Sequence, residues 1–378
     1  IQTDVEIIAK FSEKLGDRGI YAPWRRRRAL QATTYARHHI KKGYKYAADF
    51  NESEGAIVLA PHDGKLWVKK REHTIIDPES EVHWRNVSYY EVIIRKVDLT
   101  EQKDENFYTH YVHIVPIHLE ATEENPETVT VGQPIGFVSD LGWAKLPHIH
   151  FQISEDGTYN GAVDLTKQKM QGQYILKEGE YSGSTIMSEN PGKSDSGKDY
   201  KSPIKRSIIC NINAELKDNT LNIKIEGIPP EIKSEIKDAK HKIIVLKWYR
   251  KDLGKEQETG REESKYQIKD SIALPLANIS ESNEPISISI NVTEIPKEHK
   301  NKPDKINKIK IFVLKDNQPI MIDCINKSQS TKSRQQDERK ENQENEPNNN
   351  PSLANSITQK INGVISQDGD VDYFSFEG

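Results

Sequence analysis

Short runs in which apolar and polar residues alternate dominate the first half of the chain. Alternation with a period of two is typical of strands that bury one face, and turn residues such as Asp63-Gly64 separate the runs. One helix is predicted over 4–15, where Val5, Ile8 and Phe11 recur at helical spacing. The pattern therefore predicts a mostly antiparallel β-sheet domain over residues 1–178. Its main strands are expected at 56–60, 65–68, 89–97, 108–117, 134–138 and 148–153.

The pattern changes after this first domain. Residues 179–203 are rich in Ser, Gly, Asp and Lys, which predicts a linker. Short apolar strands separated by turn residues return over 204–326 and predict a β-sandwich of immunoglobulin-like type. Residues 327–352 contain two prolines and none of the hydrophobic residues Ala, Val, Ile, Leu, Met, Phe, Trp, Tyr or Cys, so they cannot bury enough surface to offset the ordering entropy, and we expect a disordered linker. A further β-domain is expected to begin at 353–378.

Composition excludes several classes of protein. The chain has 378 residues and a net charge of −4, which gives no strong attraction to nucleic acid. No apolar run approaches the length of a membrane span. Two cysteines, Cys210 and Cys324, are too few for a disulfide scaffold or a four-thiolate zinc site, and they are either bridged or two buried free thiols. The chain starts at Ile1 without a signal segment and stops inside an expected strand, so we expect a fragment or a processed form.

Histidine is concentrated in the first domain, where ten of the twelve lie between His38 and His150. The most informative local motif is Pro147-His148-Ile149-His150-Phe151. Residues two apart on a strand share a face, so His148 and His150 point the same way while Ile149 and Phe151 enter the core. Two imidazoles on one rigid face suit a metal ligand beside a catalytic base, but by itself the motif is a weak signal that two histidines on a solvated strand face would explain.

Further motifs occur in a fixed order along this domain. They are Tyr46-Ala47-Ala48-Asp49-Phe50-Asn51 preceded by His38-His39, then Val58 to Leu66 (VLAPHDGKL), Tyr108-Thr109-His110-Tyr111, Val131 to Gly136 (VGQPIG), and His148 to Phe151. In this order the segment from Tyr21 to Ile153 resembles the lysostaphin/LytM-type zinc metallopeptidases, which are peptidoglycan endopeptidases. The resemblance implies a mainly β fold of the duplicated hybrid motif type, with zinc as cofactor and peptidoglycan or another peptide as substrate.

The resemblance also implies roles for single residues. Asp49 and His150 correspond to zinc ligands, and a histidine upstream of Asp49 would be the third. The usual position of that ligand, four residues before the aspartate, is occupied by Lys45, which cannot ligate zinc when protonated. His39 fits a longer form of the motif, and His38 is the alternative.

His110 and His148 correspond to the two catalytic histidines of the family, one accepting a proton from the attacking water and the other orienting it or stabilising the oxyanion. The remaining histidines of the domain are expected to be structural or at the surface. They are His62, His73, His83, His113 and His118.

Two other functions compete with an active peptidase. Because degenerate relatives lose zinc ligands, Lys45 also suits a catalytically inactive wall-binding or regulatory module. A lipoyl- or biotin-carrier barrel is disfavoured because no Met-Lys-Met or Asp-Lys-Ala hairpin occurs.

The C-terminal stretch from Glu344 resembles the opening of the bacterial pre-peptidase C-terminal domain, through Glu346-Pro347-Asn348 and the run from Gly369 to Phe376. Both resemblances imply a secreted enzyme of the extracellular space, periplasm or cell envelope. The sequence leaves open the cleaved bond, the oligomeric state and the role of the second β-domain.

Overall fold

The structure, a computed structural model, divides by contacts into two compact units, 1–326 and 327–378, and the residues it describes all belong to the first. The helix predicted at 4–15, the pair His38-His39 and the predictions for 327–352 and 353–378 lie outside the described residues. The described residues are 19–33, 46–73, 87–98, 103–142, 144, 146–177, 182–251, 267–276, 279, 284–295, 306 and 308–326.

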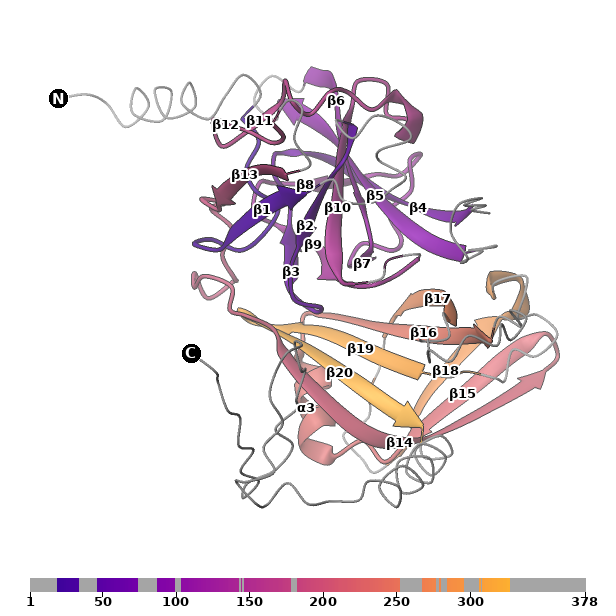
Figure 1. Ribbon diagram of the computed structural model, residues 1–378. Helices are drawn as coiled ribbons and strands as arrows, with labels where there is room; N and C mark the ends of the chain where they lie inside the picture. The colour runs from indigo at the N-terminus through magenta and orange to yellow at the C-terminus, as the bar shows by residue number, and fades with distance from the viewer. Residues whose placement is uncertain are drawn as a thin grey trace, which may run out of the picture. The chain divides into compact units, whose positions relative to one another are not determined.

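An eight-stranded, fully antiparallel sheet forms most of the first domain, which confirms the predicted mainly β fold (Figure 1). On its strand β10, Ile149, Phe151 and Ile153 enter the core, as the alternation predicts. In spatial order the strands are β13 (Ser182–Met187), β1 (Ala29–Thr33), β2 (Ala48–Asn51), β10 (His148–Ser154), β6 (Lys103–Val112), β5 (Val87–Asp98), β4 (Gly64–His73) and β8 (Glu127–Val129).

A three-stranded sheet lies against this large sheet and has two buried faces. Its order is β3 (Ile57–Leu59), β9 (Pro134–Val138) and β7 (Ile114–Pro116). One face contributes to the main core of the first domain through Val58, Ile114, Ile135 and Val138. The opposite face belongs to a second apolar cluster through Ile57, Leu59, Val115 and Phe137. Burial on both faces explains why these strands are continuous apolar runs instead of alternating ones.

The segment predicted as a linker, 179–203, contains a strand of the large sheet. Residues Ser182–Met187 form β13, which pairs antiparallel with β1. Gly183 sits so close to the backbone that a Cβ atom there would lie 2.0 Å from the carbonyl oxygen of Ile175. The small residues that suggested a flexible linker therefore allow close packing at this edge of the sheet.

Residues 204–326 form a seven-stranded sheet in which a single long strand, β14 (Ile204–Lys217), joins two halves. The first half of β14 runs parallel to β20 (Gln318–Asn326), and its second half pairs antiparallel with β15 (Thr220–Glu226). Cys210 on β14 and Cys324 on β20 are joined by a disulfide, with Cα atoms 5.6 Å apart. The remaining strands are β16 (His241–Lys251), β17 (Gln267–Pro275), β18 (Ile286–Asn291) and β19 (Lys308–Lys315).

Both halves of this sheet and the helix α3 (Pro230–Asp238) bury their apolar residues in one core. Strands β15 and β18 contribute Ile223 and Ile290, and strands β16 and β19 contribute Trp248 and Ile311. Two half-sheets around a shared core resemble a sandwich with a common strand; the immunoglobulin-like topology and the domain limits stay predictions.

The outer face of the seven-stranded sheet packs against the three-stranded sheet of the first domain. Ile243, Val245 and Phe312 join the apolar cluster that contains Ile57 and Phe137. Tyr90 on β5 adds polar contacts, because its hydroxyl accepts a hydrogen bond from Ala273 N at 2.8 Å and lies 3.2 Å from Ala273 O. The two domains are therefore joined by a packed interface within the first compact unit.

Smaller elements complete the described residues. They are η2 (Tyr159–Gly161), β11 (Lys169–Met170), β12 (Gln173–Tyr174) and η3 (Val292–Glu294).

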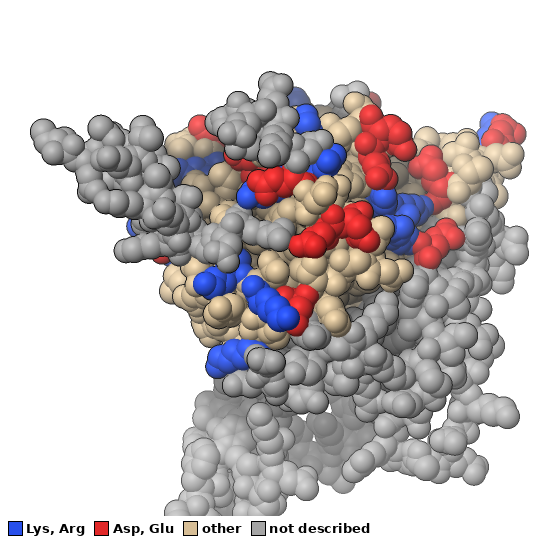
Figure 2. All heavy atoms as spheres, turned by 90° about the horizontal axis from the view of Figure 1, so that it is seen from above, with Lys and Arg blue, Asp and Glu red and all other residues tan. Residues whose placement is uncertain are grey.

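One face of the molecule displays acidic and basic side chains intermixed (Figure 2). No helix in the described residues is long and apolar enough to cross a membrane.

Candidate metal and catalytic site

Two neighbouring strands of the large sheet bring Asp49, His148 and His150 together. Asp49 on β2 lies directly opposite His150 on β10 in the antiparallel register. Its Oδ1 atom is 3.0 Å from His150 Nδ1 and 3.6 Å from His148 Nε2. Asp49 and His150 are buried, whereas the His148 side chain keeps 14% of its surface exposed. These three predicted site residues therefore share one face of the sheet.

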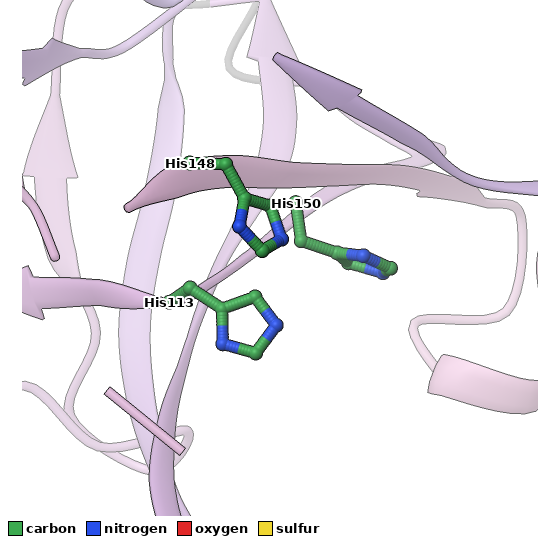
Figure 3. Close-up of side chains that lie close together, drawn as sticks. All are labelled: His113, His148 and His150. Atoms are coloured by element: carbon green, nitrogen blue, oxygen red, sulfur yellow. The ribbon is translucent and has the colours of Figure 1, made fainter. Parts of the chain in front are cut away.

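His113 reaches the same place from a kink between β6 and β7. It adopts a left-handed backbone conformation with φ of 62°, which is uncommon for a residue with a side chain. Its ring centroid lies 4.5 Å from that of His148 and 6.0 Å from that of His150. Figure 3 shows the three rings converging, with His148 and His150 on one strand and His113 on a separate segment. One nitrogen from each ring lies within 4.8 Å of the others, close enough to share a metal ion.

Backbone carbonyl groups select which ring nitrogen of two histidines carries the proton. His113 Nδ1 lies 2.6 Å from Leu141 O, and His148 Nδ1 lies 2.8 Å from Leu146 O. A carbonyl oxygen can only accept a hydrogen bond, so both Nδ1 atoms are protonated. In the neutral form of either ring, Nε2 is therefore the unprotonated nitrogen, which can accept a proton or bind a metal.

Burial keeps His113 neutral. Loss of solvation, followed by the neighbouring His148 and His150, lowers the pKa of His113 well below its ordinary value, although Leu141 O and Asp49 act in the opposite direction. Its Nε2 lone pair is thus available at neutral pH. This makes His113 a poor site for a lasting positive charge.

Tyr159 holds the second nitrogen of His150. Its Oη atom is 2.9 Å from His150 Nε2, and the two rings are nearly parallel, at 17°, with centroids 6.0 Å apart. Burial, followed by the charges of Tyr89, Glu91 and Asp49, raises the pKa of the Tyr159 hydroxyl, so it stays protonated. His150 therefore has Nδ1 directed to Asp49 and Nε2 held by a neutral hydroxyl, as metal-binding histidines commonly do.

The donor atoms fit a zinc ion. Oxygen and nitrogen ligands of a tetrahedral zinc are about 3.4 Å apart for metal–ligand bonds of roughly 2.0–2.2 Å. The 3.0 Å between Asp49 Oδ1 and His150 Nδ1 is close to that separation. Asp49 and His150 supply two ligands of the type zinc prefers, and the Nε2 atoms of His113 and His148 face the same space. The predicted third ligand, His39, lies outside the described residues.

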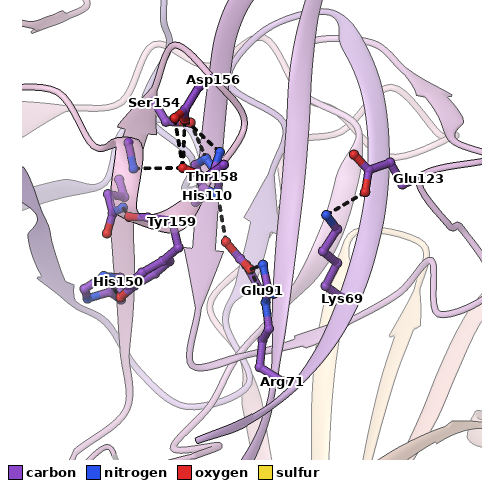
Figure 4. A network of polar contacts seen from close by, with 12 residues as sticks. Lys69, Arg71, Glu91, His110, Glu123, His150, Ser154, Asp156, Thr158 and Tyr159 are labelled. Atoms are coloured by element: carbon purple, nitrogen blue, oxygen red, sulfur yellow. Dashed lines mark hydrogen bonds and ion pairs between the residues drawn. The ribbon is translucent and has the colours of Figure 1, made fainter.

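His110 lies in a different, fully buried group. His110 Nδ1 is 2.8 Å from Glu91 Oε1, and His110 Nε2 is 2.7 Å from Ser154 Oγ (Figure 4). Arg71 extends this series of polar contacts through a 2.7 Å ion pair with Glu91. Burial raises the pKa of Glu91, but the hydrogen bond and charge of His110 and the charge of Arg71 outweigh burial and lower it.

This Ser–His–Glu order resembles a catalytic relay, but all three residues have essentially no exposed surface, so no substrate can reach Ser154. Through these hydrogen bonds the three buried side chains join the strands β5, β6 and β10. The structure thus brings Asp49, His148 and His150 together and does not bring His110 to them.

His113 joins this site, although the sequence predicts a structural or surface role for it. Tyr111-Val112-His113 has the same Tyr-x-His spacing as Tyr108-Thr109-His110, so the motif by itself fits either histidine. Strict strand alternation assigns His113 to the face opposite His110, and it does not say which face carries the site.

Carboxylate and imidazole groups gathered on a rigid sheet are donor types that zinc sites use. Residues 43–162 match the model described as Peptidase family M23, which covers about a third of the chain. The matched segment contains Asp49, His113, His148 and His150, whereas His38 and His39 precede it. Residues 43–162 of the chain are therefore a segment of the peptidase M23 type.

Several solved structures are similar to parts of the chain at low sequence identity. The catalytic domain of the antimicrobial peptidase lysostaphin from Staphylococcus simulans is 22% identical over 32% of this chain and 74% of its own, with a TM-score of 0.21. Complete lysostaphin from the same organism is 13% identical over 79% of this chain and 87% of its own, with a TM-score of 0.26. A zinc-containing peptidase from Vibrio cholerae is 19% identical over 40% of each chain, with a TM-score of 0.25. No curated protein gives a significant match.

Proposed function

We propose that this chain is a secreted zinc metalloendopeptidase that cleaves peptide bonds in the stems or cross-bridges of peptidoglycan. The observation that carries the proposal is the convergence of Asp49, His113, His148 and His150 within the M23 segment. Carboxylate and imidazole donors on adjacent strands form a rigid set, and ligand rigidity is what a catalytic zinc site requires.

Asp49 and His150 would hold the metal, the latter through Nδ1, with His39 as the third ligand. Tyr159 would then accept a hydrogen bond from the protonated Nε2 of His150 and fix its ring. Zinc bound here would lower the pKa of a coordinated water and polarise the scissile carbonyl group. Three protein ligands leave room for that chemistry.

His113 and His148 would act on the attacking water. Both present an unprotonated Nε2 to the same space, so together they can accept both O–H groups of one water and direct its lone pair outward to the substrate. The proton is better accepted by His148, because this ring retains solvent exposure, whereas burial and two neighbouring imidazoles oppose a charge on His113. His148 would later return the proton to the leaving amine.

The location outside the cytoplasm is also proposed. The disulfide between Cys210 and Cys324 suits an oxidising compartment, where such bonds persist. The resemblance of the C-terminal residues to a pre-peptidase C-terminal domain points in the same direction, and it stays a prediction. A peptidoglycan substrate is consistent with this location.

The direct test is the zinc content of the purified full chain together with hydrolysis of isolated peptidoglycan, followed by mass spectrometry of the released peptides. We expect about one zinc per chain. Asp49→Ala and His39→Ala should lose both the metal and activity. The matched variant His38→Ala should keep both, and His113→Ala should keep the metal and lose activity.

Each other result has a definite meaning. Loss of zinc in His38→Ala instead of His39→Ala would exchange the third ligand. Loss of zinc in His113→Ala would indicate a metal held by the three clustered histidines. A folded wild-type chain that binds peptidoglycan without zinc or cleavage would replace the enzyme with the inactive wall-binding module suggested by Lys45.

A further inference from the structure

Four residues after β9 connect the candidate site to the second domain. The backbone N–H of Ser139 donates to His113 O at 2.9 Å, and Leu141 O accepts from His113 Nδ1 at 2.6 Å. Gly142, with φ of 77°, lies beside the ring, because a Cβ atom there would be in ordinary van der Waals contact with His113 Nδ1 at 3.6 Å. The segment Ser139–Gly142 therefore fixes both the backbone and the ring of His113.

Asp140, in the middle of this segment, is paired with a lysine of the second domain. The ammonium group of Lys247 on β16 contacts Asp140 Oδ1, and the Lys247 side chain is 1% exposed. Lys310 on β19 lies 4.0 Å from the same oxygen and pairs with Glu54. Lys247 and Lys310 follow the same face of the sheet as Val245 and Phe312, which pack on the first domain.

Two lysines buried in an apolar interface are costly unless each meets a carboxylate. Burial lowers the pKa of Lys247 to about 8, and Asp140 opposes this effect. A lysine in a solvent-exposed contact would stay hydrated and would not need a carboxylate partner. Leu141, the next residue, is buried in the same interface cluster, so both its side chain and the neighbouring carboxylate are held by the second domain.

We propose that Lys247 is a positioning residue for the peptidase site and that the second β-domain is therefore part of the catalytic unit. Lys247 holds Asp140, Asp140 fixes the adjacent carbonyl of Leu141, and that carbonyl keeps the proton of His113 on Nδ1. The role assigned to His113 in catalysis rests on the proposed function. The contacts that connect Lys247 to the His113 ring through Asp140 and Leu141 do not depend on the proposed function.

The experiment uses the full chain and four forms: wild type, Lys247→Met, the double variant Asp140→Asn/Lys247→Met, and the control Lys308→Met. Lys308 lies on β19 and pairs with Asp323 of its own sheet at 2.6 Å, so its loss removes a lysine whose ion pair lies within the second domain. The double variant removes both charges and avoids leaving an unpaired buried carboxylate.

Three quantities are measured: kcat and KM on peptidoglycan peptides, zinc content, and the Nδ1–H resonance of His113 in chain labelled with ¹⁵N-histidine. We expect kcat to fall about 10- to 100-fold in Lys247→Met and in the double variant, with KM and zinc unchanged. The His113 Nδ1–H resonance should shift or exchange away in both. Lys308→Met should match wild type in every measurement.

A folded double variant with wild-type kcat and an unchanged His113 resonance would overturn the proposal and leave Lys247 as a purely structural pair. If wild type itself lacks zinc and peptidase activity, the proposed function fails, and the resonance alone decides the positioning role. Persistence of the signal in the double variant would then overturn it, and its loss there, with retention in Lys308→Met, would support it.

Discussion

Replacing Tyr159 with phenylalanine should weaken zinc binding without disturbing the fold. The hydroxyl of Tyr159 lies 2.9 Å from His150 Nε2, and the aromatic ring stacks beside the imidazole. Phenylalanine keeps the ring and its packing and removes only this hydrogen bond. With zinc on Nδ1, the Nε2–H group of His150 would lose its neutral acceptor in a buried position.

The size of the effect follows from the role of this bond. Outer partners of metal-bound histidines typically change metal affinity 10- to 100-fold, which corresponds to about 1.4–2.7 kcal/mol. A buried hydrogen bond left unmade costs about 1–3 kcal/mol, which agrees with that range. We therefore expect the zinc dissociation constant of Tyr159→Phe to rise by one to two powers of ten.

Competition with a chromogenic zinc chelator at neutral pH measures this constant, and thermal unfolding of the metal-free chain checks the fold. Tyr174→Phe is the matched control, because Tyr174 is 51% exposed on β12 and is not among the site residues Asp49, His113, His148 and His150. A Tyr159→Phe chain that binds zinc as tightly as wild type would refute this account of how His150 is held.

Three further results are expected. His113→Ala should reduce kcat about 10²- to 10⁴-fold with zinc retained, as measured by peptide release, whereas in a folded His110→Asn chain kcat should stay within a few-fold of wild type and the loss should be in stability. Burial lowers the pKa of His62 from its ordinary 6.5 to about 4. Between pH 4 and pH 6.5 the unfolded chain therefore binds a proton at this residue that the folded chain does not bind. Stability should fall by up to about 3 kcal/mol as pH drops from 6.5 to 4, and urea unfolding of His62→Gln should lack this component. Replacing both Cys210 and Cys324 with alanine opens a loop of 114 residues and should cost up to about 4–5 kcal/mol in urea unfolding; an unchanged midpoint would contradict the bridge.

Periodicity predicted the parts of the fold in which one face of a strand is buried. The alternation over 148–153 placed Ile149 and Phe151 in the core and left His148 and His150 on the other face. It could not predict that the short apolar strands β3, β7 and β9 form a layer with two buried faces, because the covering sheet comes from residues 204–326. A continuous apolar run indicates burial on both sides and does not name the partner.

The strand β13 was missed for a related reason. Its sequence, Ser-Gly-Ser-Thr-Ile-Met, has the composition of a linker, and its pairing with β1 depends on a contact distant in sequence. The space at Gly183 is set by the carbonyl of Ile175, so the glycine reflects tight packing. Composition alone cannot separate a glycine needed for flexibility from one needed for close approach.

The order of the motifs located Asp49, His148 and His150. The place of His113 in the cluster could not be predicted, because it depends on the backbone conformation of that one residue. Through Val112 the chain belongs to the large sheet, and from Ile114 it belongs to the three-stranded sheet. The left-handed conformation of His113 makes this change of sheet and interrupts the alternation on which the assignment of faces relied. A non-glycine residue with positive φ costs free energy, so it persists only where its surroundings compensate. Here the hydrogen bonds from Ser139 and to Leu141 compensate, and the segment that supplies them is held from the far side by Lys247. The strained residue that carries the imidazole is therefore maintained by an interface whose other side is encoded more than a hundred residues away, and no local pattern in the sequence could reveal that support.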